Sequence, residues 1–375
     1  MTTTLNIVAI TAAMAEKGLN PAGLATKLGV SRESVSKWLH AKAVPRPSKL
    51  LQLSLTLGLS RVKLLGLPTP AAQPQVAFRM SRAKPAQDEH VARAIRMGKM
   101  LEALVPHLPF DKFETPPALK SPTDGYDYLQ DLAKAIRKEM GVTETGPVNI
   151  STLAGVFKKL QAVIVPVLWG HRKNHENAIH IYLPRTATTW VYLNLDTRLC
   201  DLKFWLAHEL GHTYTFSTLQ GDAGEDFADG FAGALLFPEV LSLPLYKEAS
   251  AMRSIHARVQ QVNAAAAGQG ISPVCVAKQL DRYADRHGLP RVIDDNKALY
   301  QALELSKPPL ASKELLGSDE LELKDLIRVG EAIFHTPLYS ALKAYLRDTK
   351  ASAGYVQGIL DCSLVDAKQF VSELA

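Results

Sequence analysis

Apolar residues recur every three or four positions along most of this chain, which predicts a mainly helical protein. At the N-terminal end, glycine, proline and capping residues cut this pattern into short pieces. The pattern predicts four helices there, near residues 9–18, 21–29 and 31–40 and from about 48 onward. Asn20 and Ser31 are the expected N-caps of the second and third helices, and Gly29 is expected to close the second.

The middle of the chain mixes helical spacing with two β-rich runs. Residues 162–169 and 188–195 are dense in β-branched and aromatic side chains and predict strands. Residues 202–210 return to helical spacing, with Asp201 as the expected N-cap, and residues 224–236 predict another helix. The strand that directly precedes the helix at 202–210 could bind an extended peptide by edge pairing.

Two proline-rich stretches mark the boundaries in the first third of the chain. Residues 67–75 hold three prolines and residues 106–124 hold five, a composition typical of linkers. Between them, residues 89–104 predict a connecting helix, although Gly98 interrupts its apolar stripe. The expected parts are a helical domain at 1–66, a linker with a helix at 67–125, a mixed domain at 126–289 and a helical region at 290–375. The expected fold class is α+β and multidomain.

Composition excludes several classes of protein. Apolar residues make up 47% and charged residues 21% of the 375, as in globular proteins and unlike disordered ones. No apolar run approaches the roughly 18 to 20 residues of a membrane span, and no signal peptide is visible. Three scattered cysteines do not form a disulfide framework. We therefore expect a cytoplasmic protein with no membrane partner.

Positive charge is concentrated at the N-terminal end. Residues 1–66 hold nine basic and two acidic side chains, a net charge of +7, whereas the rest of the chain holds 34 and 35. The third predicted helix buries Val35, Trp38 and Leu39 on one face. Its other face and the following turn carry the residues that we expect to contact double-stranded DNA: Arg32, Glu33, Ser36, Lys37, His40 and Lys42. The alternatives are solvated surface lysines or a helix-turn-helix used only for protein contact.

This segment resembles the Xre/Cro type of helix-turn-helix repressor domain. The residues that carry the resemblance are GLATKLGVSRESVSKWLHAKAVPRPSKLLQL, which include the Gly-Val-Ser turn and the Ser-Lys-Trp stretch. The resemblance covers about residues 5–66. It implies sequence-specific binding of double-stranded DNA, and it implies a homodimer.

The strongest chemical signal is the run Ala-His-Glu-Leu-Gly-His at residues 207–212. Two histidines four positions apart on a helix are separated by only about 40° around its axis, so His208 and His212 can reach one ion. Glu209 projects to the neighbouring side, where it can accept a proton from a metal-bound water. The spacing predicts a zinc hydrolase with Glu209 as general base, and two surface histidines are the weak alternative.

A catalytic zinc site of this kind needs a third protein ligand. An acidic cluster follows His212, and Glu225 is the expected ligand in it, with Asp226 as the competing choice. Asp229 lies on the same helix face as Glu225, where it could hold a zinc-bound histidine by its second nitrogen. Acidic residues early in a helix are also ordinary partners of the helix dipole. The expected cofactor is one Zn²⁺ per chain, although this ligand set tolerates manganese too.

Other polar side chains near this motif have two interpretations each. Tyr192 or Tyr214 could polarise a scissile carbonyl, but we expect both to pack in the core. His171, His175 and His180 could touch a substrate, but we expect them to be solvated.

The run RLCDLKFWLAHELGHTYTF, followed by EDFADGFAGALLFP, resembles the ImmA/IrrE family of zinc metallopeptidases. The resemblance covers about residues 126–285 and includes the similar closing helix ISPVCVAKQLDRYA. It implies a zincin-like domain with a small sheet, with His208, His212 and Glu225 as metal ligands and Glu209 as base. Many members of the family have a glutamate directly before an Ala-Asn or Ala-Asp pair. In this chain the pair is Ala228-Asp229, and Phe227 precedes it. Members are implicated in cleaving helix-turn-helix repressors.

Three functions remain open from the sequence. In the first, the chain is a DNA-binding regulatory zinc metalloprotease that cleaves a protein, expected to be a helix-turn-helix repressor, to control stress or mobile-element genes. In the second, it is a transcription regulator whose metallopeptidase-like domain is a sensor or inactive. In the third, it is the antitoxin or immunity component of a two-gene module. The intact metal motif favours the first.

Overall fold

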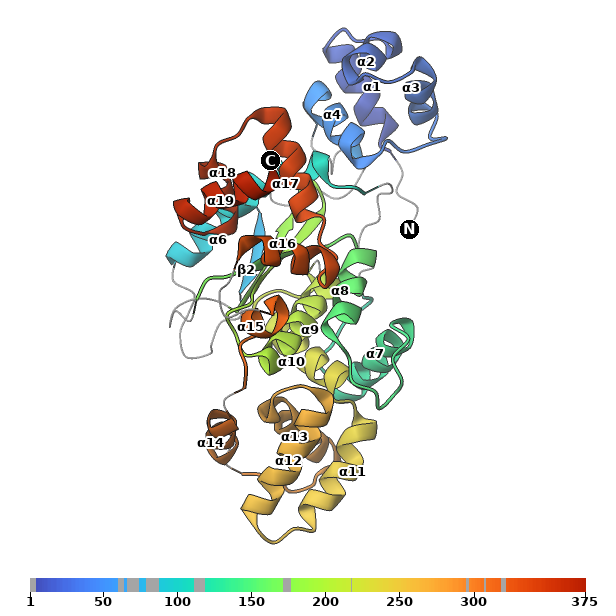
Figure 1. Ribbon diagram of the computed structural model, residues 1–375. Helices are drawn as coiled ribbons and strands as arrows, with labels where there is room; N and C mark the ends of the chain where they lie inside the picture. The colour runs from blue at the N-terminus through green and yellow to red at the C-terminus, as the bar shows by residue number, and fades with distance from the viewer. Residues whose placement is uncertain are drawn as a thin grey trace.

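The computed structural model describes residues 5–59, 64–65, 74–78, 88–110, 119–170, 177–216, 218–294, 297–306, 308–317 and 322–375. These residues form an elongated molecule with a small helical domain at one end (Figure 1). A mixed sheet lies in the middle, and a group of helices that includes α11 (Glu239–Ser250), α12 (Ile255–Gln269) and α13 (Pro273–His287) lies at the other end.

The N-terminal domain consists of α1 (Ile7–Glu16), α2 (Pro21–Leu28), α3 (Arg32–Leu39) and α4 (Pro47–Leu57). The Asn20 side chain accepts a hydrogen bond from Gly23 N–H, and the Ser31 hydroxyl accepts one from Ser34 N–H, so both predicted N-caps are confirmed. Gly29 closes α2 at φ 60°, a left-handed conformation that favours glycine.

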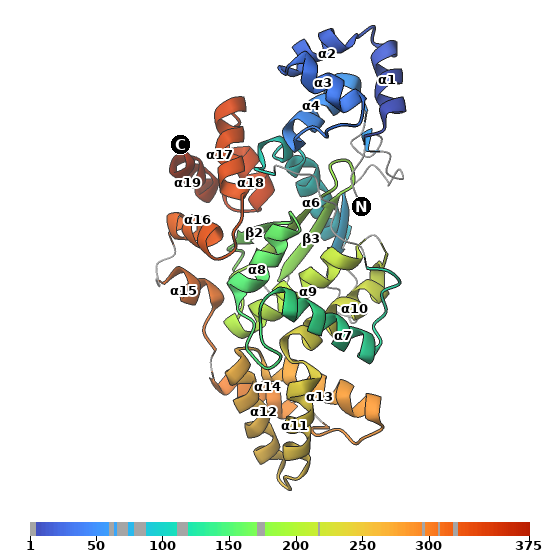
Figure 2. The same cartoon turned by 90° about the vertical axis from the view of Figure 1, so that its right-hand side faces the viewer.

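The N-terminal domain has a hydrophobic core of its own. Val35 and Trp38 of α3 are buried in one cluster with Leu24 and Leu28 of α2, and Leu39 packs against the edge of that cluster. The predicted apolar face of the third helix is therefore confirmed, and it docks on the second helix. Figures 1 and 2 show α4 on the side of the domain that faces the rest of the chain, where it contacts the short 3-10 helix η1 (Val105–His107).

Four strands form the sheet: β1 (Gln75–Phe78), β2 (Val163–Val167), β3 (Ala178–Leu183) and β4 (Thr188–Asn194). Their order is β1-β3-β4-β2, with β2 parallel to β4 and the other two pairs antiparallel. The two strands predicted from β-branched content, β2 and β4, are confirmed. The expectation that the strand before the metal-motif helix offers a free edge is wrong, because β4 is paired on both sides and buried along its whole length.

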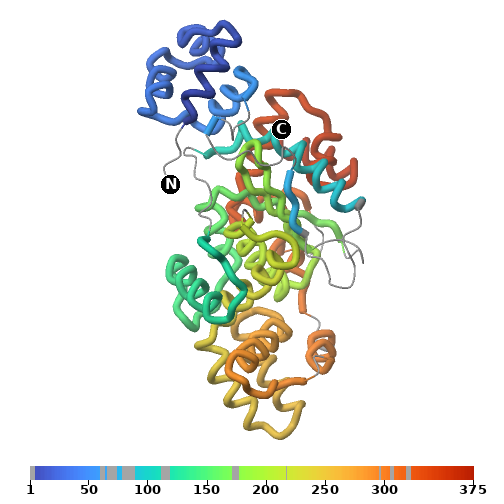
Figure 3. Tube along the Cα trace, turned by 180° about the vertical axis from the view of Figure 1, so that it is seen from behind, coloured from blue at the N-terminus to red at the C-terminus, as the bar shows by residue number. Residues whose placement is uncertain are grey.

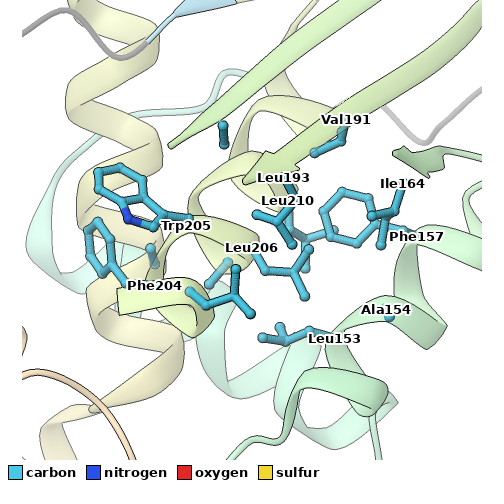
Figure 4. Close-up of a cluster of buried hydrophobic side chains, with 14 of the residues drawn as sticks. Leu153, Ala154, Phe157, Ile164, Val191, Leu193, Phe204, Trp205, Leu206 and Leu210 are labelled. Atoms are coloured by element: carbon cyan, nitrogen blue, oxygen red, sulfur yellow. The ribbon is translucent and has the colours of Figure 1, made fainter. Parts of the chain in front are cut away.

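Helices cover both faces of this sheet. On one face, α8 (Ile150–Lys159) and α9 (Leu199–Thr215) pack on β2, β3 and β4. Figure 4 shows Leu206 and Leu210 of α9 pointing toward Phe157 of α8 and Val191 of β4. The opposite face meets α6 (Asp88–Leu101) together with α17 (Leu338–Thr349) and α18 (Ala353–Leu360) of the C-terminal region, and α16 (Leu323–Ala332) contacts the edge strand β2.

The C-terminal region is built into the same core as the sheet. Its helices α15 (Ala311–Leu316) to α19 (Leu364–Leu374) supply buried residues to one hydrophobic cluster that extends from Ala94 to Leu374. The Tyr192 hydroxyl donates a hydrogen bond to the Ile359 carbonyl at 2.6 Å. The sequence boundaries at 125/126 and 289/290 therefore do not separate hydrophobic cores.

Two local expectations about helices need correction. The connecting helix ends at Leu101 and not at 104, and Gly98 lies within it, where an added Cβ would sit 2.7 Å from Pro74 Cβ and 3.0 Å from Ile181 Cγ2. Gly98 thus allows close packing on the sheet and is not a break. Asp201 is not the N-cap of α9, because the helix begins at Leu199 behind Arg198, and Asp201 lies in its first turn.

Membrane-spanning potential is confined to one bent pair in the described part of the chain. No single helix there is both long and apolar enough to cross a membrane; α10 (Gly221–Leu236) and α11 meet the length and composition requirement only when taken together, with a 78° bend.

Candidate metal centre

Three residues with potential ligand atoms converge between α9 and α10. His208 Nε2 lies 3.1 Å from His212 Nε2; His208 Nε2 lies 3.3 Å from Glu225 Oε2, and His212 Nε2 lies 3.2 Å from Glu225 Oε1. In a tetrahedral site with bonds of about 2.0–2.1 Å, ligand atoms are about 3.3–3.4 Å apart. These separations therefore fit one zinc ion. Among the described residues, His208, His212 and Glu225 are the group whose ligand atoms meet in this way.

The packing of α10 on α9 creates this arrangement. His208 and His212 lie on the same face of α9 because they are four positions apart. Gly211 lies between them and lets the two helices approach, since a Cβ there would sit 3.0 Å from Ala228 Cα. On α10, Phe227 and Phe231 are fully buried and fix the helix on its other side, which leaves Glu225 facing the histidines.

Asp229 orients one of the two histidines. Its Oδ1 lies 3.0 Å from His208 Nδ1, so the Nδ1–H can donate to the carboxylate while the Nε2 lone pair faces the centre. This is the contact that the sequence predicted for Asp229. The alternative ligand Asp226 is not in the convergent group of described residues.

The electrostatics of the centre favour a positive charge at the meeting point. Burial by itself lowers the pKa of His208, but the hydrogen bonds to Asp229 and Glu225 outweigh burial and raise the pKa to about 9. Burial raises the pKa of Glu225, but His208 and His212 outweigh it and lower the pKa to about 2. Both directions mean that the surroundings stabilise a cation beside an ionised carboxylate.

Glu209 and His180 form a second buried contact next to the ligands. Glu209 is 2% exposed, and its Oε2 lies 3.3 Å from Nδ1 of His180 on β3. His180 has no exposed surface and stacks on Phe216, with ring centroids 4.9 Å apart. The expectation that His180 is solvated is therefore wrong. Burial lowers the pKa of His180 against the opposing effect of Glu209, which favours the neutral imidazole.

A signal for His180 was present in the sequence. It stands between Ile179 and Ile181 in an apolar run, and a strand that buries both faces reads as a nearly continuous apolar stretch. A histidine in such a run is buried and needs a partner. The other two histidines of that region, His171 and His175, lie outside the described residues.

The two tyrosines pack in the core, as expected. Tyr192 stacks on Trp169 with ring centroids 5.9 Å apart, and its hydroxyl donates a hydrogen bond to the Ile359 carbonyl. It lies on the face of the sheet that meets the C-terminal helices. Tyr214 is buried edge-on against Phe231.

The six residues expected to meet DNA all lie exposed on or directly after α3. Arg32 is the first residue of that helix, and Lys42 lies in the turn after it. Lys37 Nζ lies 2.8 Å from Glu33 Oε1, and the His40 ring Nδ1 lies 2.8 Å from the Ser36 carbonyl oxygen. The exposed face is thus polar and continuous.

Comparison with known proteins bears on this N-terminal domain. Residues 10–64 match a family model for helix-turn-helix domains. This segment is a helix-turn-helix domain of the Xre type. Searches of curated proteins and of solved structures found no match to the chain. The match supports the N-terminal domain as the DNA-binding domain of a regulator, with α3 as its recognition helix.

Proposed function

We propose that this chain is a DNA-binding regulatory metallopeptidase that holds one zinc ion and hydrolyses a protein substrate. The observation that carries the proposal is the convergence of His208, His212 and Glu225, with the Glu209 carboxylate buried beside them. Three protein ligands leave one tetrahedral position open, which distinguishes a catalytic zinc site from a structural one.

Peptide hydrolysis would use different residues of this chain for metal binding, for orienting a ligand and for proton transfer. His208, His212 and Glu225 would hold a zinc ion, which would supply polarisation of the substrate carbonyl and a coordinated water with a pKa of about 7. Asp229 would hold the His208 ring in the tautomer that leaves Nε2 free to coordinate. Glu209 accepts the proton of the attacking water at its carboxylate and delivers it to the leaving amine.

The resemblance to ImmA/IrrE metallopeptidases supports a protein substrate, and the helix-turn-helix domain supports a regulatory setting. We propose a helix-turn-helix repressor as the substrate and a homodimer as the acting form. In this arrangement the N-terminal domain brings the peptidase to DNA or to a repressor bound there. Cleavage of the repressor would then release stress or mobile-element genes.

Metal analysis combined with a cleavage assay tests this function. The purified chain, Glu209→Gln and His208→Ala are each analysed for zinc and incubated with the repressor encoded nearest to this gene. The expected result is about one zinc per chain, lost in His208→Ala, with cleavage that stops in Glu209→Gln. Absence of bound zinc or manganese from the unmodified chain would refute the metallopeptidase.

One observation favours a second function. Glu209 and both histidines are at most 4% exposed, whereas the Glu225 side chain is 19% exposed, so the centre meets solvent mainly on its α10 side. A largely buried metal site suits a sensor that changes the DNA affinity of the regulator without hydrolysis. In that case zinc or manganese would shift the affinity of the full chain for its operator, and Glu209→Gln would leave that shift unchanged.

A further inference from the structure

The backbone side of β3 that faces away from β4, its outer edge, lies directly beside the candidate metal centre. Along its inner edge β3 pairs with β4, whose other edge is taken by β2. His180 in the middle of β3 turns its ring to Glu209. The outer edge of β3 is therefore where an extended peptide could pair with the sheet and run past the carboxylate that is proposed to act as base.

In this structure β1 lies on that outer edge. It pairs antiparallel with β3 at four positions, and Ala77 stands opposite His180 while Gln75 stands opposite Tyr182. Opposed residues of an antiparallel pair project to the same face. Ala77 and Gln75 thus project to the α9 face of the sheet, where Glu209 lies, and Val76 projects to the α6 face. Figure 3 shows β1, the short blue segment in the middle of the molecule, beside α6 in cyan.

The pairing between β1 and the sheet is short. The strand has four residues, and Gln75, Val76 and Ala77 are only half-buried, whereas β4 is buried throughout. Pro74, directly before the strand, is buried against Gly98 of α6. Val76 packs against the hydrophobic core but is itself only half-buried, so release of β1 uncovers the margin of that core and leaves the packing of α8 and α9 on the other strands in place.

We propose that the outer edge of β3 is the docking edge for an extended stretch of the substrate protein, and that β1 occupies this edge in cis. The proposal rests on the proposed peptidase function in naming the docked peptide as a substrate. A substrate strand pairs with β3 only after β1 has left. Because residues 66–73 tie β1 to the helix-turn-helix domain, the segment that guards the edge is also the connection to the DNA-binding part of the chain.

Two reversible or local changes separate the bound and released forms of β1. Gln75→Cys with Tyr182→Cys places two thiols at directly opposed positions, and opposed Cα atoms about 4.5–5.5 Å apart lie within disulfide range. Oxidation then locks β1 on β3, and a reductant releases it. Ala77→Pro weakens the pairing of β1, because proline lacks the N–H of a strand residue and fits poorly in a ladder. Each single cysteine variant is the matched control for the lock.

The first measurement needs neither metal nor catalysis. A fluorescent synthetic peptide with the sequence of residues 66–87 is titrated into each full-length variant and followed by polarisation. We expect it to bind Ala77→Pro at least about tenfold more tightly than the oxidised lock, since loss of even two net hydrogen bonds of about 1 kcal/mol exceeds one factor of ten. Equal binding by the locked and released forms of the double-cysteine variant would overturn the proposal, even if Ala77→Pro does not fold.

The second measurement uses the zinc-loaded proteins and unfolded, carboxymethylated casein. We expect Ala77→Pro to cut faster than the unmodified chain, and the oxidised lock to cut at least about tenfold more slowly than the same protein after reduction. If the peptide docks as expected but no form cuts casein or a repressor, the proposed function fails while the docking edge stands. If casein is cut equally by locked and released forms, the function stands and the docking edge is wrong.

Discussion

The candidate metal centre and the recognition helix are built in opposite ways. The centre takes side chains from β3, α9 and α10, which meet only because the whole core is folded. The four from β3 and α9 are buried, and Glu225 and Asp229 of α10 are partly buried. The face expected to contact DNA takes its side chains from α3 and the turn after it, and exposes all of them. Substitutions at the centre should therefore act as a connected set, whereas substitutions on α3 should act singly.

The largest effect is expected from His208→Ala. This change removes a metal ligand and leaves Glu225 and Asp229 facing each other's charge without the imidazole between them. We expect complete loss of stoichiometric zinc, measured by metal analysis of the purified protein. We also expect complete loss of hydrolysis in the cleavage assay. His287→Ala, which removes a half-exposed histidine of α13, is the control and should retain one zinc. Retention of zinc by His208→Ala would remove His208 from the ligand set.

Glu209→Gln should separate chemistry from metal binding. The amide keeps the shape of the side chain but cannot accept the proton of the attacking water. We expect hydrolysis to fall by a factor of about 10² to 10⁴ with zinc content unchanged. Glu314→Gln on the exposed surface of α15 is the matched control and should cut normally. Normal cutting by Glu209→Gln would assign the base elsewhere.

His180 can show whether the centre acts as a connected set. His180→Asn keeps an N–H donor near the position of Nδ1, whereas His180→Leu removes it from beside Glu209. If His180 positions that carboxylate, kcat should fall in the leucine variant by more than in the asparagine variant, while KM and zinc content stay unchanged in both. Equal kcat values for the two variants, with both proteins folded by circular dichroism, would reduce His180 to a packing residue.

Asp229→Asn should have a smaller effect on the metal. The amide can still meet the His208 Nδ1–H through its oxygen, but it lacks the charge that fixes and strengthens the ligand. Partners of this kind typically change metal affinity by about 10- to 100-fold, and we expect a loss in that range. Competition with a chelating dye measures it. An unchanged affinity would mean that the contact has no influence on the metal.

How far the sequence predicts each region follows from the same contrast. The caps Asn20 and Ser31, the exposed face of α3 and the pairing of His208 with His212 depend on spacing within one helix, and sequence alone predicted them. Spacing also indicated Glu225 and Asp229, because these two residues are one helical turn apart from each other on the next amphipathic helix. The features that the sequence predicted wrongly or did not predict depend on tertiary packing. His180 meets Glu209 only through the fit of β3 on α9, and β1 is a strand only because β3 has an edge for it.

The smallest effects are expected on α3, and they should differ in kind between neighbouring residues. Arg32, at the exposed start of the recognition helix, is placed to reach base edges, so Arg32→Ala should weaken operator binding by about 1–3 kcal/mol and relax the sequence preference. Lys42, in the turn that follows, is placed for phosphate. Lys42→Ala should weaken binding to all sequences similarly and reduce the salt dependence, the slope of log K against log salt, by about one.

Fluorescence titrations of both variants at several salt concentrations, with operator and scrambled DNA, measure this difference. Zinc content is the internal control and should stay the same in both, because the helix-turn-helix domain has a core separate from that of the metal centre. If Arg32→Ala lowers the affinity for operator and scrambled DNA equally, α3 holds the backbone and does not read bases. If either change also alters zinc occupancy, the two regions are coupled, and the contrast between a connected centre and an independent recognition helix is wrong.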